Sequence, residues 1–262
     1  MIPDVVPPLP RVKSWRRNVS MRAPLRWLAA GWSDLIRNPL ASLAVGMFVF
    51  GASISAIAGL SATGSDAILF PAFAGFLIVG PLLAVGLYEK SRRLAAGEPV
   101  TLRDMILVKP ASGGQILYAG ALLCLLWVLW LRSAVIIYAL FFGLLPFPGL
   151  STISQMLVHT PSGWVLVGVG SCVGGLFAGF AFAISAFSIP MLLDRRIDAF
   201  TAMGSSLALV WNNLAVMFIW GAIVVVLFAA CLATALVGLI VVFPWLGHAT
   251  WHAYRDMRGS AP

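Results

Sequence analysis

Apolar residues occur along this chain in long uninterrupted runs rather than in alternation with polar ones. A helix that crosses the hydrocarbon core of a bilayer needs about 20 consecutive apolar residues. Five runs have about this length or more: 41–63, 67–88, 116–145, 164–193 and 214–243. The pattern predicts an all-α fold, a polytopic membrane helical bundle.

The fifth run continues past its apolar part through Pro244 to Tyr254. It forms either one long kinked helix or two spans that turn near Thr234–Gly238. The distribution of charge decides between these alternatives, because cytoplasmic flanks of membrane helices carry an excess of Lys and Arg.

Basic residues lie in four clusters between the apolar runs: 11–37, 90–109, 195–196 and 255–258. Six spans with the amino terminus inside place all four clusters on one face, and the opposite loops then hold no Lys or Arg. Five spans would leave Arg255 and Arg258 outside. We therefore predict six transmembrane helices with both termini in the cytoplasm. The expected organisation is a flexible cytoplasmic tail at 1–18, a six-span domain at 19–258 and a short tail at 259–262.

Composition supports a membrane protein and excludes several other classes. The 262 residues are 61% hydrophobic and only 10% charged, with a net charge of +8, whereas soluble proteins carry about a quarter charged residues. A soluble domain, a disordered chain and a nucleic-acid-binding protein are excluded. The three cysteines lie within apolar runs without a CxxC spacing, which argues against a disulfide framework or a zinc site. We expect the lipid bilayer to be the main partner.

The sequence shows a weak threefold pattern. Three polar segments lead toward outward spans and have the character of short amphipathic helices at the interface: 31–39, 102–110 and 202–213. Each returning span carries a proline, at Pro81, Pro190 and Pro244. The chain is either a threefold hairpin pseudo-repeat, with three broken helices converging at the cytoplasmic side, or a polytopic protein in which such features recur by chance.

Arg132 is the single basic residue deep in an apolar run. A cation inside the membrane costs several kcal/mol and is by default functional or paired. Arg132 either lines an ion or substrate pathway, or it extends toward the outer headgroups or makes structural hydrogen bonds. Asp66 is its expected partner, because it is the acid of the first outer turn.

Small residues form two GxxxG registers in the fourth span, Gly170/Gly174 and Gly175/Gly179. Small residues allow helix backbones to approach closely in a membrane. We expect these glycines to pack tightly within the bundle, and homodimerisation through the same face is the alternative.

His248 and His252 are four residues apart, which places them on one face of a helix. Asp256 continues that face, and Glu89 ends another span on the same side. A His-x-x-x-His-x-x-x-Asp pattern can supply ligands to a transition metal, and the histidine pair can flank a haem. The alternative is a structural histidine pair at the interface, within a belt of tryptophan and tyrosine. In that case the chain needs no cofactor.

The sequence contains no catalytic motif of the kinds GxSxG, P-loop or HExxH, and no paired carboxylates within an apolar run. We therefore expect a non-enzymatic protein.

Several stretches resemble a family of bacterial integral membrane proteins, the domain of unknown function 2189. They are P-L-R-W-L at 24–28 with G-W-S-D-L at 31–35, G-P-L-L-A-V-G-L-Y-E at 80–89 with S-R-R at 91–93, W-L-R at 130–132, and G-L-I-V-V-F-P-W-L-G-H-A-T-W-H-A-Y-R at 238–255. The resemblance extends from residue 20 to the end and is most specific at the carboxyl terminus. It implies a multi-pass protein of the bacterial inner membrane. Some members are labelled putative cytochrome c oxidase subunits, which implies a respiratory-chain context.

Three functions follow as expectations. The favoured one is a non-enzymatic inner-membrane protein that binds other membrane-protein subunits, such as an accessory or assembly factor of a respiratory oxidase. With three histidines in all, the chain lacks the ligands of a catalytic haem–copper subunit. The alternatives are a small-solute transporter with a cavity lined by Ser171, Ser185, Ser188 and Arg132, and a haem- or metal-handling protein that uses His248 and His252.

Overall fold

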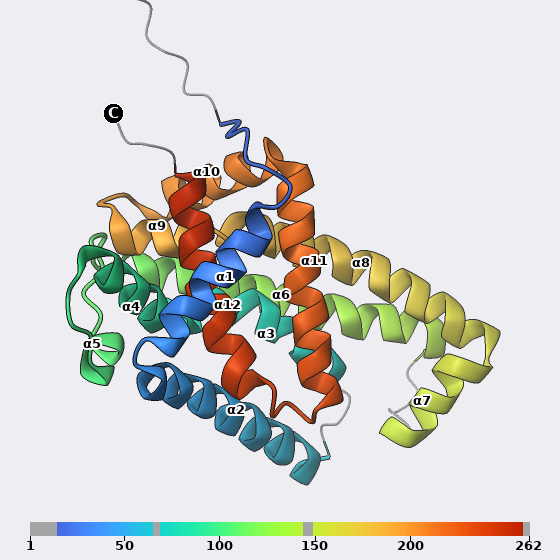
Figure 1. The fold of residues 1–262 in the computed structure, drawn as a ribbon. Helices are drawn as coiled ribbons and strands as arrows, with labels where there is room; N and C mark the ends of the chain where they lie inside the picture. Colours follow the sequence, from blue (N-terminus) through green and yellow to red (C-terminus); the bar gives the residue numbers. More distant parts are fainter. Residues whose placement is uncertain (1–14, 65–68, 144–148, 259–262) are drawn as a thin grey trace, which may run out of the picture.

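The computed structural model describes residues 15–64, 69–143 and 149–258, and within these ranges the chain is helical, without strands. Figure 1 shows the helices in order. They are α1 (Ala23–Ile36), α2 (Pro39–Ala62), α3 (Leu69–Leu83), α4 (Val85–Ala96), α5 (Leu102–Ile106), α6 (Gln115–Phe142), α7 (Leu150–His159), α8 (Pro161–Ser185), α9 (Ser188–Asp194), α10 (Ala199–Trp211), α11 (Leu214–Ala233) and α12 (Leu239–Met257). The predicted all-α class is confirmed.

Local sequence signals set several helix starts. Pro39 and Pro161 occupy the first turn of α2 and α8, where a missing N–H costs nothing. Thr160 caps α8 by accepting a hydrogen bond from the amide of Gly163 at 3.0 Å. Asp198 caps α10 through the amide of Thr201 at 2.9 Å. These caps satisfy amides that have no partner within their own helix.

Four helices are long and apolar enough to cross a membrane: Pro39–Ala62, Gln115–Phe142, Pro161–Asp194 (α8 with α9) and Leu214–Ala233. They coincide with the first, third, fourth and fifth apolar runs. The second run is divided between α3 and α4, because the chain departs from helical geometry at Ala84, three residues after Pro81. The segment from Leu239 forms a separate helix, α12. The fifth run therefore contains a turn between α11 and α12 and is not one long kinked helix.

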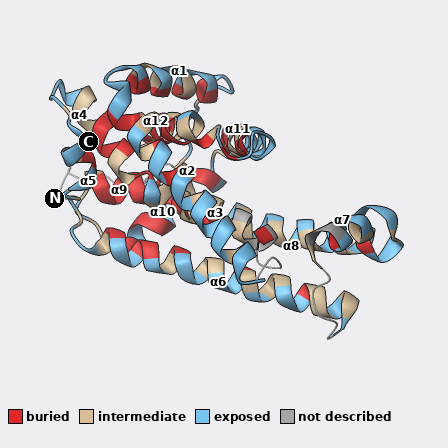
Figure 2. Cartoon of the chain, turned by 90° about the horizontal axis from the view of Figure 1, so that it is seen from below, coloured by how far each residue is buried: buried red, intermediate tan, exposed pale blue. Residues whose placement is uncertain are grey.

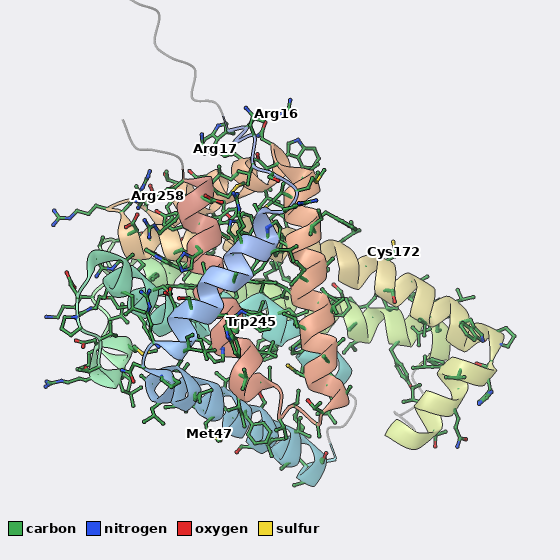
Figure 3. All side chains as sticks on the ribbon, viewed as in Figure 1. Arg16, Arg17, Met47, Cys172, Trp245 and Arg258 are labelled. Carbon is green, nitrogen blue, oxygen red and sulfur yellow. The ribbon has the colours of Figure 1, made fainter. Side chains whose placement is uncertain are left out.

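The helices gather at one end of the molecule and separate toward the other. Figure 1 shows α6 and α8 running side by side toward α7, away from the end where α1, α4, α9 and the last turns of α12 meet. Figure 2 shows that the buried residues concentrate on α1, α9, α10 and α12. Arg16, Arg17 and Arg258 lie at this compact end, whereas Met47 and Cys172 lie away from it (Figure 3).

The second parts of the three returning segments meet at the compact end. Helix α4 packs against both α9 and α12. Their facing side chains are fully buried: Leu87 of α4, Leu192 of α9, and Ala253 of α12. These helices therefore meet at one end of the molecule, whereas the threefold hairpin arrangement and the direction in which each segment crosses the membrane stay predictions.

The short helices that precede the outward spans are present but are not free interfacial helices. α1 begins at Ala23 rather than near residue 31, and it packs along α12 and buries Trp27. α10 packs against α8 and α9. α5 has only five residues and is held by a capping box between Thr101 and Asp104. The apolar sides of α1 and α10 are thus covered in part by protein.

The glycine registers of α8 do not form a tight helix contact, which corrects the expectation from the sequence. A Cβ atom added to Gly170, Gly175 or Gly179 would have no neighbour within 4 Å outside its own helix among the described residues. Only Gly174 has a close neighbour, the ring of Trp130, which a Cβ atom would approach to 2.9 Å. The bulk of this indole between α6 and α8 prevents the backbones from approaching as GxxxG contacts do. Homodimerisation through the open glycines stays a prediction.

Candidate functional site

The compact end contains a cluster of buried polar side chains from four helices. Asp34 of α1, Ser42 of α2, Lys90 and Ser91 of α4, and His248 of α12 are each at most 6% exposed. Buried polar groups cost free energy unless they are hydrogen-bonded. Their arrangement therefore depends on the bonds that they make with one another.

Lys90 is fully buried. Its Nζ donates to the carbonyl of Asn38 at 2.9 Å and to Ser42 Oγ at 2.7 Å. Burial lowers the pKa of Lys90 to about 8, while the negative charge of Asp34 acts in the opposite direction. The ammonium group thus ties α4 to the beginning of α2 at a cost in desolvation.

His248 bridges two serines. Its Nε2 lies 2.9 Å from Ser42 Oγ, and its Nδ1 lies 2.8 Å from Ser91 Oγ. Because Ser42 Oγ accepts from Lys90, its own proton is available to Nε2. Nδ1–H then donates to Ser91, which corresponds to a neutral imidazole with its proton on Nδ1.

Asp34 receives a hydrogen bond from His252 Nε2 at 2.8 Å. Burial by itself raises the pKa of Asp34, but the hydrogen bonds from His252 and Ser91 outweigh it and hold that pKa below its usual value. The contacts form one continuous network, which runs from Lys90 through Ser42, His248 and Ser91 to Asp34 and His252. We call these six residues the inner polar network.

The three side chains of the predicted metal site face different partners. His248 has both ring nitrogens in hydrogen bonds with serines, and His252 binds Asp34. Asp256 accepts from Trp27 Nε1 at 2.9 Å and lies 3.6 Å from Arg26. Within the described ranges, no group of three His, Cys, Asp or Glu side chains is placed to hold a metal ion. Each histidine thus has hydrogen-bond partners of its own, and both the metal or haem site and its structural alternative stay predictions.

Glu89 is also buried, but it stands apart from the inner polar network. It accepts from Arg92 at 2.8 Å and from Arg93 at 2.7 Å, on the same helix. Asp194, at the end of α9, accepts from Tyr254 Oη at 2.7 Å and from Arg258 at 2.6 Å. Asp194 thus joins α9 to the end of α12, whereas the partners of Glu89 lie within α4.

The residues predicted to line a polar pathway are not brought together. Arg132 and Ser171 are exposed on α6 and α8, whereas Ser185 and Ser188 are buried. Asp66, the expected partner of Arg132, lies outside the described residues. Among the three prolines, Pro81 lines a pocket between α3, α8, α11 and α12, whereas Pro190 and Pro244 are buried in α9 and α12.

Sequence reasoning found the two histidines but missed Asp34, Ser42, Lys90 and Ser91 as their partners. Lys90 was counted only as a charge at the end of a span. A usable signal was the position of Lys90 and Ser91, which follow the apolar second run within three residues, after Glu89 and before the arginines 92 and 93. Such residues lie at the depth where the last turns of other helices are also buried.

Lys90 gives stability a defined dependence on pH. Its pKa is about 8 in the folded protein and 10.5 in the ordinary case, so the unfolded state binds more protons between these values. The contribution of Lys90 to the free energy of unfolding therefore rises with pH across this window. We expect the stability of the wild type to increase, relative to that of Lys90→Met, from pH 7.5 to pH 9.5 in detergent-unfolding titrations. A pH-independent difference would contradict a buried, charged Lys90.

Comparison with known proteins finds a family that part of the chain resembles. No curated protein and no solved structure matches the chain. The family described as "Predicted integral membrane protein (DUF2189)" matches residues 69–194. This range includes the 80–89 and 130–132 stretches of the resemblance, whereas the carboxyl-terminal stretch, which seemed the most specific, lies outside it. Over residues 69–194, which extend from α3 to the end of α9, the chain is thus similar to this family of predicted integral membrane proteins.

Proposed function

We propose that the chain is a non-enzymatic protein of the bacterial inner membrane that binds other membrane components through its long apolar helices. In this proposal the protein has six spans, with the apolar run 67–88 and α12 crossing the membrane beside the four long apolar helices, and both termini lie in the cytoplasm. The one-sided distribution of basic residues supports this topology.

The observation that carries the proposal is that the rest of the protein buries only a small part of most of the long apolar helices. The most apolar stretch is 11% buried in Pro39–Ala62, 22% in Gln115–Phe142 and 22% in Leu214–Ala233, against 61% in Pro161–Asp194. A groove of about 410 Å³ follows α2 and α3, with Phe48, Ile57 and Trp127 among its lining residues. Three helices thus offer most of their surface to lipid or to another membrane protein.

The carboxylates support a non-enzymatic role. Asp34, Glu89 and Asp194 are engaged with His252, arginines and Tyr254 at the compact end. Asp104 and Asp198 cap helices. Each of these acids thus has a structural partner.

Photo-crosslinking tests the proposal. A photoreactive amino acid at Phe48, in the groove, should give a discrete crosslinked protein band in native membranes, whereas the same residue at Arg103 on α5 should not. A reporter fused to residue 262 should be active only in the cytoplasm. Crosslinks to lipid alone at Phe48, Leu125 and Phe218 would contradict a protein partner, and a periplasmic reporter signal would contradict the six-span topology.

The specific partner that we propose is a respiratory oxidase, for which the chain would be an accessory or assembly factor. This part of the proposal rests on the family resemblance. Purification in a mild detergent should recover oxidase subunits with the wild-type chain, and deletion of the gene should lower the amount of assembled oxidase. Unchanged oxidase assembly after deletion would contradict this partner.

A second candidate is a small-solute transporter. The observation that favours it is a pocket at the break between α3 and α4, which Pro81 and Ser185 line. Arg132 lies on the exposed side of α6, away from this pocket. Solute flux in proteoliposomes would therefore identify this function if Arg132→Leu leaves the flux unchanged and a substitution that fills the pocket abolishes it. Absence of flux for all solutes would leave the binding function alone.

A further inference from the structure

The pocket beside Pro81 has a volume of about 110 Å³ and lies where α3, α8, α11 and α12 meet near the compact end. Aromatic side chains form part of its walls, beside aliphatic residues such as Leu77 and Val224: Phe76, Phe182, Trp220, Phe228 and Phe243. Phe76 stands against both Phe228 and Phe243, with ring centroids 5.2 and 5.8 Å apart. Such walls favour a ligand with an aromatic ring, because edge-to-face and offset contacts stabilise ring pairs.

Two hydroxyl groups in this pocket have no hydrogen-bond partner among the residues that the structure describes. Tyr88 and Ser185 both line it and are each 2% exposed. Neither hydroxyl makes a hydrogen bond with any residue in the described ranges. The two hydroxyl oxygens are not among the fully enclosed partnerless atoms of the described residues, so each keeps surface that a molecule in the pocket can reach. A ligand that hydrogen-bonds them would replace the water that otherwise satisfies them.

Proline also frees backbone acceptors at the pocket. Pro81 has no N–H to donate to the carbonyl of Leu77, and Pro190 has none for the carbonyl of Ala186. Leu77 and Ala186 both line the pocket. Its apolar surface is therefore interrupted by two hydroxyl groups and bordered by two residues whose carbonyls lack their usual helical donor.

Size and charge restrict the ligand further. An apolar cavity of about 150 Å³ in another protein holds one benzene molecule, so a pocket of about 110 Å³ with a partly open side is suited to a single ring. No Lys, Arg, Asp or Glu lines it, and an ionised ligand would be buried without a counter-charge.

We propose that this pocket binds a small, uncharged aromatic molecule that carries one hydroxyl group, a simple phenol or aryl alcohol. The ring lies among the aromatic walls, and the hydroxyl group accepts from Tyr88 or Ser185. Its own proton is donated to one of the freed carbonyls. This inference concerns binding alone and does not depend on whether the chain assembles with another protein or transports the ligand.

Fluorine NMR with 4-fluorophenol and the full chain in detergent micelles tests the proposal. We expect saturable binding in the wild type, weakened about tenfold in at least one of Tyr88→Phe and Ser185→Ala, because each substitution removes one candidate donor hydroxyl and keeps the rest of the side chain. Ser171→Ala is the matched control on the same helix as Ser185, since Ser171 is exposed, and it should bind as the wild type does.

Fluorobenzene separates the proposal from its rivals. It should bind at least tenfold more weakly than 4-fluorophenol. Equal binding of the two probes would show a merely apolar site, suited to a lipid chain, and would overturn the proposal. Non-saturable signals for both probes, with no difference between the wild type and Tyr88→Phe, would show a pocket filled by water and would overturn it as well. Circular dichroism of each variant confirms that it is folded.

Discussion

Gly46→Ala should lower the free energy of unfolding by about 1–3 kcal/mol, although it adds only one methyl group. Gly46 lies where α2 crosses α12, and an added Cβ atom would overlap the carbonyl oxygen of Ile240. Pro244 leaves that carbonyl without its usual helical donor, so it lies directly over the Gly46 backbone. Backbone atoms cannot rotate away as a side chain does, and α2 must therefore move from α12.

Gly51→Ala is the matched control, because Gly51 is in the same helix and an added Cβ atom would have no neighbour within 4 Å outside that helix. We expect it to leave stability unchanged or to raise it slightly, since alanine has the better helix propensity. Reversible unfolding in detergent mixtures measures both variants. Equal stabilities for Gly46→Ala and Gly51→Ala would contradict the close contact between α2 and α12.

The sequence predicts the apolar helices because their signal is local. A run such as 116–145 contains its own evidence, and α6 follows it at both ends within a few residues. Pro81 likewise marks the break between α3 and α4. The prediction of tight packing at the glycines of α8 was wrong, because a GxxxG pattern indicates which face of a helix carries small residues but not which residue of another helix lies opposite that face. In this fold, the side chain of Trp130 is the residue that faces Gly174.

The inner polar network could not be predicted in the same way, because its members are far apart in the chain. Asp34 and His252 are 218 positions apart, and Ser91 and His248 are 157 apart. The spacing of His248 and His252 correctly placed both on α12, but on this helix each side chain reaches a different neighbour, α2 with α4 in one case and α1 in the other. The spacing of the two histidines on α12 therefore suggested that they bind one metal or haem, whereas the packing of four helices gives each histidine its own hydrogen-bond partners.

Asp34→Asn should be the most destabilising change within the inner polar network, by about 2 kcal/mol. Its carboxylate is the negative charge that favours the ammonium form of Lys90, and it holds His252 through a hydrogen bond of 2.8 Å. Asparagine keeps the shape and can accept the same bond, but it removes the charge. Loss of the partner charge leaves the Lys90 cation buried without compensation, and because the pKa of Lys90 is about 8, release of its proton limits this cost at pH 7 to about 1–2 kcal/mol. Unfolding titrations at pH 7 measure this loss.

Asp256→Asn is the control, because it removes the same charge from an exposed carboxylate and so shows how much of the effect of Asp34→Asn depends on burial. Asp256 also faces α1, but its side chain is 44% exposed and lies 3.6 Å from Arg26, so its loss should cost at most about 1 kcal/mol. Adding Lys90→Met to Asp34→Asn should restore part of the stability, because the double variant no longer buries an uncompensated cation. If Asp34→Asn is as mild as Asp256→Asn, or if Lys90→Met makes it worse, the two charges do not depend on each other. The compact end would then be held by apolar packing and the caps alone, and the burial of Lys90 would need another explanation.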